Sequence, residues 1–461
     1  MAALVKLDDP GRSLFWTAPA ADDSELATED PLALDYVSQQ LGLQLLPTLT
    51  TRSTRAQAFA MVLYGLALVE RAIALYHAPV TVESRRHLFE RWERFWALAT
   101  LEFREGELPR GDPDAMRGVQ GARAAWRPGK GPLPLDYPLI SRQQELGNLG
   151  AYLSPLRRAG LVLDDLRPSA AALDIIDAFW DEADNKHRGR YHDYALLALQ
   201  PDASKIERSH ANLTLARVGE FSRLTSLTER SRAQQQRRLY DALLAQARDP
   251  FTAAVTSLVQ AAVRLDIDSA ADILDAAVAG RLGPVDVALS ELLVTARRFG
   301  DAMAAMLTTF DGIYAAIQQE GWTASAAKIA NAVLPPQVLA ELQHAGRRLL
   351  DAPRANLLRG LPMHGAAYMR LTEQLIGADP VTALDAILGY HAAVQRERRR
   401  GEGWIRSEHG TLVLLVTSYT ARPEADRFPS YKLSAVRQLL SDTGRLSSDA
   451  KRRRSGAEDP P

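Results

Sequence analysis

The feature that most constrains the fold is a series of apolar residues with helical spacing between residues 56 and 76. They follow one another at steps of three and four: Phe59, Val62, Leu66, Val69, Ile73 and Tyr76. This spacing places them on one face of a helix, and further leucines make the other faces apolar as well. A helix that is apolar almost all round belongs inside a protein core. Its most apolar stretch, 56–69, is too short to cross a bilayer, so no membrane partner is expected.

Two further segments show the same period. Between residues 83 and 103, Leu88, Trp92, Phe95 and Ala99 form one stripe with arginines beside it. Aromatic rings interleaved with arginine can stack nucleic-acid bases, but helical spacing favours core packing with the arginines reaching outward. From residue 284 onward, the heptad-like spacing predicts a helix of about 30 residues, roughly 45 Å long. Its apolar positions are Phe299, Met303, Met306, Phe310, Ile313 and Ile317.

Composition limits the chemistry and the partners. The 461 residues suffice for two or three domains, and 46% hydrophobic with 24% charged residues is typical of globular proteins. The absence of cysteine excludes disulfides, thiolate metal sites, iron–sulfur clusters and cysteine nucleophiles. With 55 basic and 56 acidic residues, any nucleic-acid binding must come from a local patch. The N-terminus lacks a secretory pattern, so we expect a cytoplasmic protein.

The segment 141–180 resembles a winged-helix domain in the order of its elements. It reads as a short helix at 141–148, a second helix at 150–159, an apolar strand at 160–163 and a third helix after Ser169. In winged helices the helix before the wing enters the major groove. Arg157 and Arg158 would lie at the end of that helix and are candidate nucleic-acid contacts. Pro155 departs from the pattern, because proline is expected to bend or split this helix.

A second candidate region lies near the C-terminus. Asp379-Pro380 predicts a helix start with a cap and a first-turn proline, and the helix ends in Arg398, Arg399 and Arg400 before a glycine. These arginines are either a nucleic-acid-binding patch or the cations that favour a helix C-terminus. Residues 403–406 and 411–416 then predict a β-hairpin, and helix follows at 431–440. Helix, hairpin and helix together suggest a second winged-helix-like element.

The predicted fold class is therefore mainly α, a multi-helical bundle with winged-helix-like elements and a small C-terminal β-hairpin. Composition shifts divide the chain into consecutive segments. These are a loose leader (1–30), an N-terminal helical block (31–105), a Gly/Pro-rich linker or loop (106–138), a winged-helix-like domain (139–200), a helical domain (201–400), a hairpin plus helix (401–446) and a disordered tail (447–461).

Candidate chemistry is sparse. Asp184, His187 and His192 combine carboxylate and imidazole at helical spacing, as metal ligation requires, but neighbouring Lys and Arg favour a solvated helix end. Arg359 and His364 have the Arg-x4-His spacing of helical ribonucleases, yet an intervening glycine and proline should break the helix that presents them. His391 fits a core histidine better than a catalytic base. We expect no cofactor and no metal.

Two stretches resemble large, uncharacterised helical proteins encoded in bacterial phage-defence islands. They are 45–55, which leads into the aromatic-rich helices, and 389–404 from Gly-Tyr-His to Gly-Trp. The resemblance implies partners from a multi-gene system, such as a helicase, a nuclease or an ATPase, and supplies no catalytic residues.

Three functions follow from these observations. The leading hypothesis is a non-enzymatic accessory subunit of an antiviral defence or DNA-processing system, which binds DNA, partner proteins or both. The first alternative is a kleisin-like subunit of a condensin-type complex, in which terminal winged helices are joined by helices that bridge an ATPase dimer. The second is a helical ribonuclease centred on His364.

Overall fold

The computed structural model describes residues 30–108, 116–180, 188–223, 233–361, 363–398 and 401–446, and the fold is mainly α. Outside these ranges lie the predicted leader except for Asp30, the predicted tail at 447–461, two arginines of the second candidate patch, Arg399 and Arg400, and two metal candidates, Asp184 and His187. The chain forms two compact units. Unit 1 comprises Met1–Gln40 and Val294–Pro429, and unit 2 comprises Leu41–Leu293 and Ser430–Pro461. Each unit is built from two stretches that are far apart in the sequence. The predicted division into consecutive segments does not describe such units.

Unit 2 is helical, with two short β-ladders. Its ladders pair β1 (Leu133–Pro134) with β2 (Lys205–Ile206) and β3 (Ser209–His210) with β4 (Leu213–Thr214), both antiparallel. Its helices are α3 (Ala56–Tyr76), α4 (Val82–Phe103), α5 (Val119–Ala125), α6 (Gln143–Leu146), α7 (Asn148–Arg158), α8 (Leu173–Asp177), α9 (Arg188–Ala198), α10 (Leu215–Phe221), α11 (Ala233–Tyr240), α12 (Thr252–Arg264), α13 (Ala270–Val278) and α20 (Leu433–Asp442). Short 3-10 turns flank α8, and a π turn follows α11.

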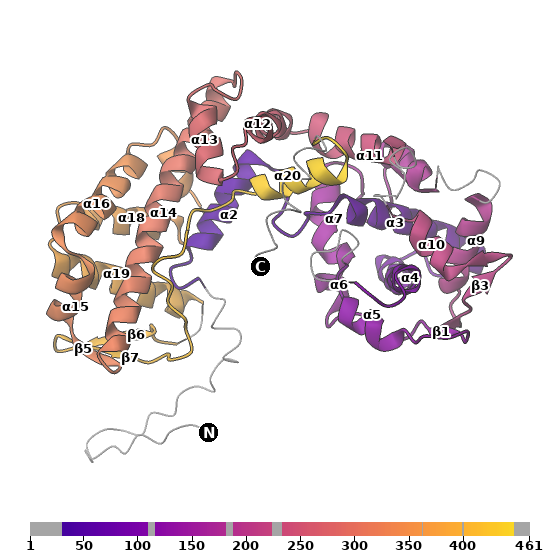
Figure 1. Ribbon diagram of the computed structural model, residues 1–461, viewed down its shortest axis with the longest axis horizontal. Coiled ribbons are helices and arrows are strands. Elements are labelled where there is room, and N and C mark those ends of the chain that lie inside the picture. Colours follow the sequence, from indigo (N-terminus) through magenta and orange to yellow (C-terminus); the bar gives the residue numbers. More distant parts are fainter. Residues whose placement is uncertain are drawn as a thin grey trace, which may run out of the picture. The chain divides into compact units, whose positions relative to one another are not determined.

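The predicted core helices form the centre of unit 2. Figure 1 views α4 almost end-on, with α3, α5, α9 and α10 around it, and α4 packs on each of them. Phe59 and Trp92 are fully buried. Among the described helices, α3 alone is long and apolar enough to cross a membrane. Of its 18-residue apolar stretch, 72% is buried inside the protein. The helical period at 56–76 therefore marks a core helix, as predicted.

The contact between α10 and α4 is close because Gly219 has no side chain. A Cβ atom at this position would lie 2.0 Å from the carbonyl oxygen of Ala99. Alanine normally stabilises a helix relative to glycine by about 1 kcal/mol. Here we expect Gly219→Ala to destabilise the protein by about 1–3 kcal/mol, because backbone must move to admit the methyl group.

Urea unfolding measures this change. The control is Gly131→Ala, since a Cβ at Gly131 meets nothing within 4 Å. It should shift the free energy of unfolding by less than about 0.5 kcal/mol. Equal stability of the two variants would contradict the close approach of α10 to α4.

Unit 1 consists of helices with one small sheet. Its helices are α15 (Ala326–Val333), α16 (Pro336–Leu350), α17 (Ala355–Arg359), α18 (Gly365–Leu375) and α19 (Pro380–Glu397). Two helices run across the unit boundaries, α2 (Leu34–Leu45) and α14 (Val287–Gln319). The 33 residues of α14 match the predicted long helix. Its apolar positions from Phe299 to Ile317 are buried within unit 1, so they serve packing inside the chain.

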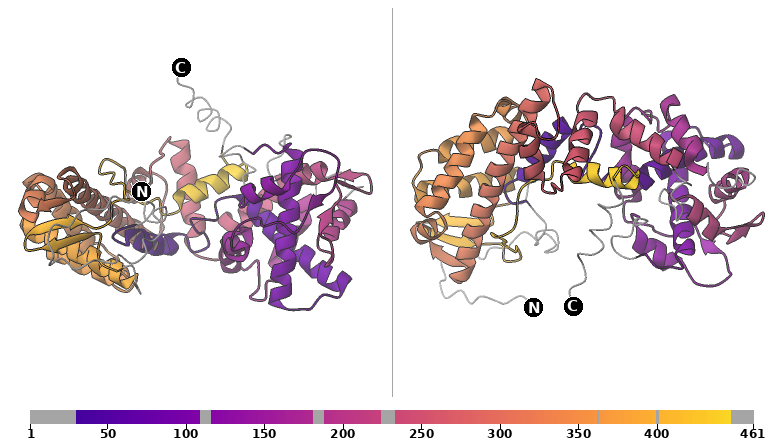
Figure 2. Two further views of the ribbon diagram at one scale, coloured as in Figure 1. Left: turned by 90° about the horizontal axis from the view of Figure 1, so that it is seen from below. Right: turned by 45° about the horizontal axis from the view of Figure 1, so that its top comes forward.

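The predicted hairpin is present and belongs to a larger element. Strands β6 (Ile405–Glu408) and β7 (Thr411–Leu414) pair antiparallel, and β5 (Thr323–Ser325), which the sequence did not predict, adds to β7. The sheet lies beside the C-terminal end of α14 (Figures 1 and 2). Helix α15 follows β5 and packs on α19, which precedes β6.

Strands β5–β7, α15 and α19 form one element, with α16–α18 inserted in the sequence between the two helices that pack together. The prediction that the helix after the hairpin completes the element was wrong, because α20 belongs to unit 2. The third strand and α15 complete it instead. Strand β5 has only three residues, too few for a visible alternation of apolar and polar positions.

Four local expectations also need correction. Residues 106–138 are not simply a loop, because α5 and β1 form within them. Pro155 does not split α7, which continues through it, since Pro155 is buried and only one backbone hydrogen bond is lost. Residues 160–163 form no strand; a single bridge joins Val162 to Pro168. Ser169 donates its hydroxyl hydrogen to the carbonyl of Gly160 at 2.7 Å, so it does not cap the following helix.

Candidate nucleic-acid interface

The N-terminus of α7, the predicted recognition helix, is held by a buried carboxylate on α4. Glu93 is 1% exposed and accepts hydrogen bonds from the backbone N–H of Asn148 at 2.6 Å and from the Gln143 side chain at 2.8 Å. Burial raises the pKa of Glu93, and these hydrogen bonds oppose the rise. The positive end of the helix dipole favours an acid here. Glu93 therefore fixes where α7 begins.

Removing this carboxylate should loosen the start of α7. In Glu93→Ala, the N–H of Asn148 and the Gln143 amide lose a buried acceptor, at a cost of about 1–3 kcal/mol. We expect faster amide hydrogen exchange at residues 148–151, measured by mass spectrometry or NMR. The control is Glu145→Ala, an exposed acid paired only with Arg142 at 3.3 Å. Unchanged exchange at 148–151 in Glu93→Ala would show that the contact does not support the helix.

The two faces of α7 differ in burial. Leu149, Tyr152 and Leu156 are buried, and the Tyr152 ring meets Phe59 of α3 edge-on at 4.8 Å between centroids. The opposite face is exposed and follows a spacing of four, with Gly150, Ser154 and Arg158. Because these residues are small or cationic, this face can approach another molecule closely. It is the face that a recognition helix would present.

A short hydrogen-bonded loop follows α7, at the position of the predicted wing. The N–H of Leu163 bonds to the carbonyl of Arg167, and the N–H of Ser169 bonds to the carbonyl of Leu161, both near 2.9 Å. Arg157 joins the helix to this loop through the carbonyl of Asp164 at 2.6 Å, with its carboxylate at 3.8 Å. Arg157 is thus half-exposed and partly neutralised.

Arg158, in contrast, is exposed and lies against the loop at 46–53, whose backbone carbonyls accept bonds from several cations. Arg158 donates to the Pro47 carbonyl at 3.0 Å. Lys432, at the start of α20, donates to Leu46 and Leu49 at 3.1 and 2.7 Å. Arg117 approaches the carbonyl of Arg52 at 3.4 Å. We name the side chains of Arg52, Arg117, Arg157, Arg158 and Lys432 the loop cluster.

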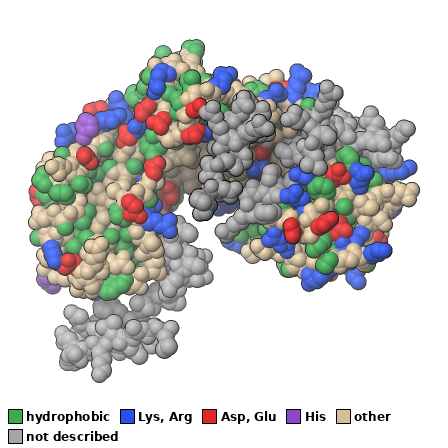
Figure 3. Space-filling view, in the orientation of Figure 1, with side chains coloured by type: hydrophobic (Ala, Val, Ile, Leu, Met, Phe, Trp, Pro, Cys, Tyr) green, Lys and Arg blue, Asp and Glu red, His purple; other side chains and the backbone are tan. Residues whose placement is uncertain are grey.

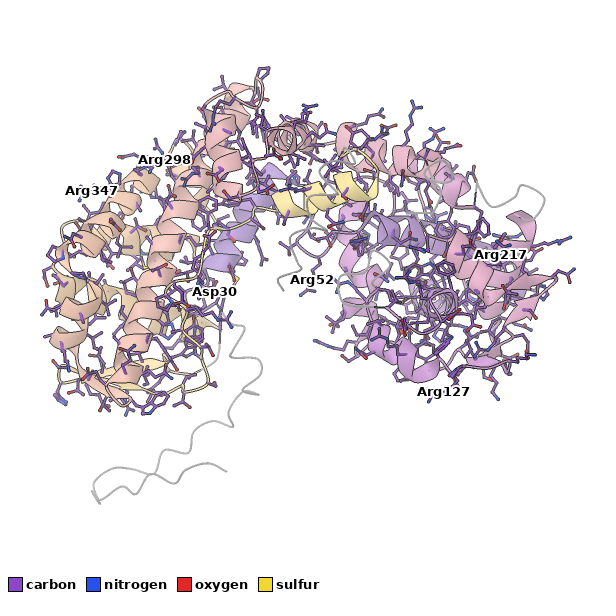
Figure 4. The ribbon with its side chains drawn as sticks, in the orientation of Figure 1. Asp30, Arg52, Arg127, Arg217, Arg298 and Arg347 are labelled. Atoms are coloured by element: carbon purple, nitrogen blue, oxygen red, sulfur yellow. The ribbon has the colours of Figure 1, made fainter. Side chains whose placement is uncertain are left out.

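The charge of the loop cluster depends on burial. Lys432 is 3% exposed, and burial together with Arg158 lowers its pKa to about 7. The outer members of the cluster are Arg52 and Arg158, which are exposed. Figure 4 labels Arg52 on the loop that precedes α3. On the face visible in Figure 3, basic and acidic side chains are interspersed on each unit, so the loop cluster is a local feature.

Sequence reasoning singled out Arg157 and Arg158 but missed Arg52, Arg117, Lys432 and Glu93 as their neighbours. These residues come from distant parts of the chain, and no local pattern connects them. One sequence signal for the loop was the stretch 45–55, which resembles phage-defence proteins and contains the loop itself.

At the other predicted patch, Arg398 follows the last residue of α19 and donates to the carbonyl of Asp30 at 2.9 Å. This placement agrees with the helix-end interpretation for Arg398. Arg399 and Arg400 lie outside the described residues, so the binding interpretation remains a prediction for them.

Of the metal candidates, His192 alone is described. It is half-buried, its Nδ1 lies 3.0 Å from the hydroxyl of Tyr64, and burial lowers its pKa. Within the described ranges, no group of three or more Asp, Glu or His side chains is arranged to hold a metal ion.

The ribonuclease candidates occupy separate helices, as expected from the intervening glycine and proline. Arg359 ends α17, is exposed and pairs with Glu373 at 2.8 Å. His364 precedes α18 and is buried, with its Nδ1 3.2 Å from Glu397. Burial lowers the pKa of His364, and Glu397 opposes this shift. The two residues contact different carboxylates.

Comparisons with protein-family models, curated proteins and solved structures found no match for this chain.

Proposed function

We propose that this protein is a non-enzymatic accessory subunit of a bacterial antiviral defence or DNA-processing system, and that it holds duplex DNA through α7 and the loop cluster. One observation carries the DNA contact: the exposed face of α7 ends at Arg158, which bonds to the loop that also carries Arg52. Arginine side chains at the end of a groove-sized helix suit phosphate contacts, which position a protein on DNA. The resemblance of residues 45–55 and 389–404 to phage-defence proteins supports the wider role.

Fluorescence anisotropy with a short DNA duplex at about 50 and about 200 mM salt tests the proposal. We expect binding at the lower salt that weakens steeply at the higher salt. The logarithm of the association constant should fall with a slope of about −0.9 per phosphate contact against the logarithm of salt concentration. Absence of binding at low salt, both alone and with the products of neighbouring genes, would contradict DNA contact.

The kleisin-like alternative has one observation in its favour: the two predicted winged-helix-like segments, at 141–180 and around the hairpin β6–β7, belong to separate units. A kleisin must bring down a coiled-coil ATPase when it is purified from its host. Co-purification of such an ATPase in stoichiometric amount would favour this alternative over an independent DNA-binding subunit.

A further inference from the structure

The exposed face of α19 in unit 1 is unusually open. The helix buries Leu384, Leu388 and His391, whereas Asp385, Gly389 and Ala393 are exposed. A Cβ atom at Gly389 would meet nothing within 4 Å. A glycine in mid-helix costs about 1 kcal/mol relative to alanine. The packing of unit 1 does not require a glycine at position 389. The open surface beside Gly389 therefore points to a role other than packing.

Strand β6 lies across from this face and is an edge strand of the sheet β5-β7-β6 in the described part of the chain. His409 and Gly410 form its two-residue turn, with φ values of 49° and 78°, as a type I′ hairpin requires. Residues 408 and 411 therefore exchange hydrogen bonds, and the pattern alternates along the strands. The N–H of Leu415 bonds to the carbonyl of Trp404 at 2.8 Å, which agrees with hydrogen bonding at every second residue.

Ile405 and Ser407 lie between the residues that bond to β7. Their backbone N–H and C=O groups therefore point away from β7. An exposed edge of this kind is a template for an added strand. A groove of about 450 Å³ runs between α19 and β6, and Gly389, Ala392, Ile405 and Ser407 line it. From Asp385 to Arg396 the helix rises about 16 Å, the length of a strand of about five residues.

The charges along the groove select the class of occupant. Four charged side chains line it, and one of them, Arg406, is paired with Glu408 at 3.0 Å. Asp385, Glu402 and Arg396 remain, two acids and one base, which give the groove a net charge of −1. A phosphate backbone is disfavoured there, whereas a peptide segment with a basic residue is favoured.

We propose that the groove between α19 and β6 binds an extended, weakly basic segment of a partner protein, which adds to β6 as a fourth strand. Main-chain bonds to Ile405 and Ser407 supply the pairing, and Gly389 with Ala392 leaves room for alternate side chains. A basic side chain of the segment meets Asp385. The inference concerns unit 1 alone and does not depend on DNA contact by α7 in unit 2.

A displayed library of random ten-residue peptides tests this proposal with the full chain as bait. The variant Gly389→Leu fills the groove without a clash, and Gly389→Ala is the matched control. Selected peptides should carry a basic residue, bind the wild type and Gly389→Ala within about twofold, and lose at least tenfold in affinity for Gly389→Leu, or about 1.4 kcal/mol. Bound peptide should slow amide exchange at Ile405 and Ser407.

A chemical control separates strand addition from other binding modes. Methylation of alternate backbone nitrogens in a selected peptide removes the donors that face β6 and should abolish binding, whereas methylation of the intervening nitrogens should not. The proposal is overturned if no peptide is enriched, if binding is insensitive to Gly389→Leu, or if the exchange of Ile405 and Ser407 is unchanged. Binding that appears only after deletion of residues 1–29 would assign the groove to the chain itself and would also overturn it.

Discussion

Reversing the charges of Arg52 and Arg158 together is expected to lower the affinity for duplex DNA roughly 100-fold at about 50 mM salt. Both side chains are exposed members of the loop cluster, and Arg158 ends the open face of α7. Each reversal removes one cation from the phosphate backbone and adds a repulsive charge. The slope of affinity against salt should therefore become shallower by at least about 2.

The matched control is the double variant Arg127→Glu and Arg217→Glu. Both arginines are exposed in the same unit, and Figure 4 shows them on parts of it away from Arg52. This variant has the same change in net charge and should lose less than about threefold in affinity, because long-range charge is screened over roughly 10 Å. Equal losses in both double variants would mean that general charge, and not the loop cluster, drives binding.

Because Arg158 also bonds to the Pro47 carbonyl, the double reversal must be separated from a disturbed loop. Arg158→Gln retains a donor for this carbonyl and removes the charge. It should lower the affinity roughly tenfold, with unchanged thermal unfolding. Full affinity in Arg158→Gln would remove this residue from the proposed interface.

Replacing His391 with alanine should have the second large effect, a loss of roughly 3–5 kcal/mol in the free energy of unfolding. His391 is fully buried. Its Nδ1 lies 2.8 Å from the carbonyl of Pro31, and its Nε2 accepts the N–H of Trp404 at 2.9 Å. These partners require the neutral ring with its hydrogen on Nδ1. Alanine leaves the buried N–H of Trp404 without its acceptor, removes one of two donors to the Pro31 carbonyl, which Gln395 also contacts at 3.3 Å, and opens a cavity.

The pH dependence of this loss provides a further test. Burial lowers the pKa of His391 to about 4 from its ordinary value of 6.5. A folded-state pKa below the unfolded value means that protonation favours unfolding, so the contribution of His391 is complete above pH 6.5 and is lost as the pH falls towards 4. The difference between wild type and His391→Ala should therefore shrink over this range.

Chemical denaturation at several pH values measures the difference, with His344→Ala, an exposed histidine on α16, as the control. The control should change the stability by less than about 0.5 kcal/mol at every pH. A difference for His391→Ala that grows on acidification would contradict the assigned hydrogen bonds.

His391 is also one of several side chains that hold the segment at residues 30–32 against α19. The hydroxyl of Tyr390 donates to the carbonyl of Leu32 at 3.0 Å, and Arg398 donates to the carbonyl of Asp30. Figure 4 labels Asp30 at this position. Burial, and to a lesser degree Asp35, raises the pKa of Asp30 to about 7. The raised pKa of Asp30 acts in the opposite direction to that of His391, since protonation of Asp30 favours the folded state.

Sequence reasoning located the elements whose apolar positions repeat over many turns. Helices α3, α4, α14 and α19 were predicted nearly to their ends, and His391 was correctly placed in the core. A long helix can be recognised in the sequence because its apolar positions repeat over several turns. The hairpin was found for a similar local reason, from two apolar runs at 403–406 and 411–416, although the turn at His409 and Gly410 is shorter than the predicted separation at 407–410.

The parts that escaped prediction depend on contacts between distant positions. Strand β5 is defined by its pairing with β7, about 90 residues later in the chain. The loop cluster brings residues near 50, 117, 158 and 432 together through backbone carbonyls, which leave no trace in side-chain pattern. Pro155 was misjudged because burial of its ring offsets the hydrogen bond that it removes.

The discontinuous composition of the two units affects how this chain can be studied and how it folds. Synthesis reaches residue 293 before most of unit 1 exists, and α20, which completes unit 2, follows only after residue 429. Pairings across such long intervals slow folding. Ordinary truncation at any residue between 41 and 429 would leave both units incomplete, so point variants in the full chain are the appropriate tools for assigning roles to either one.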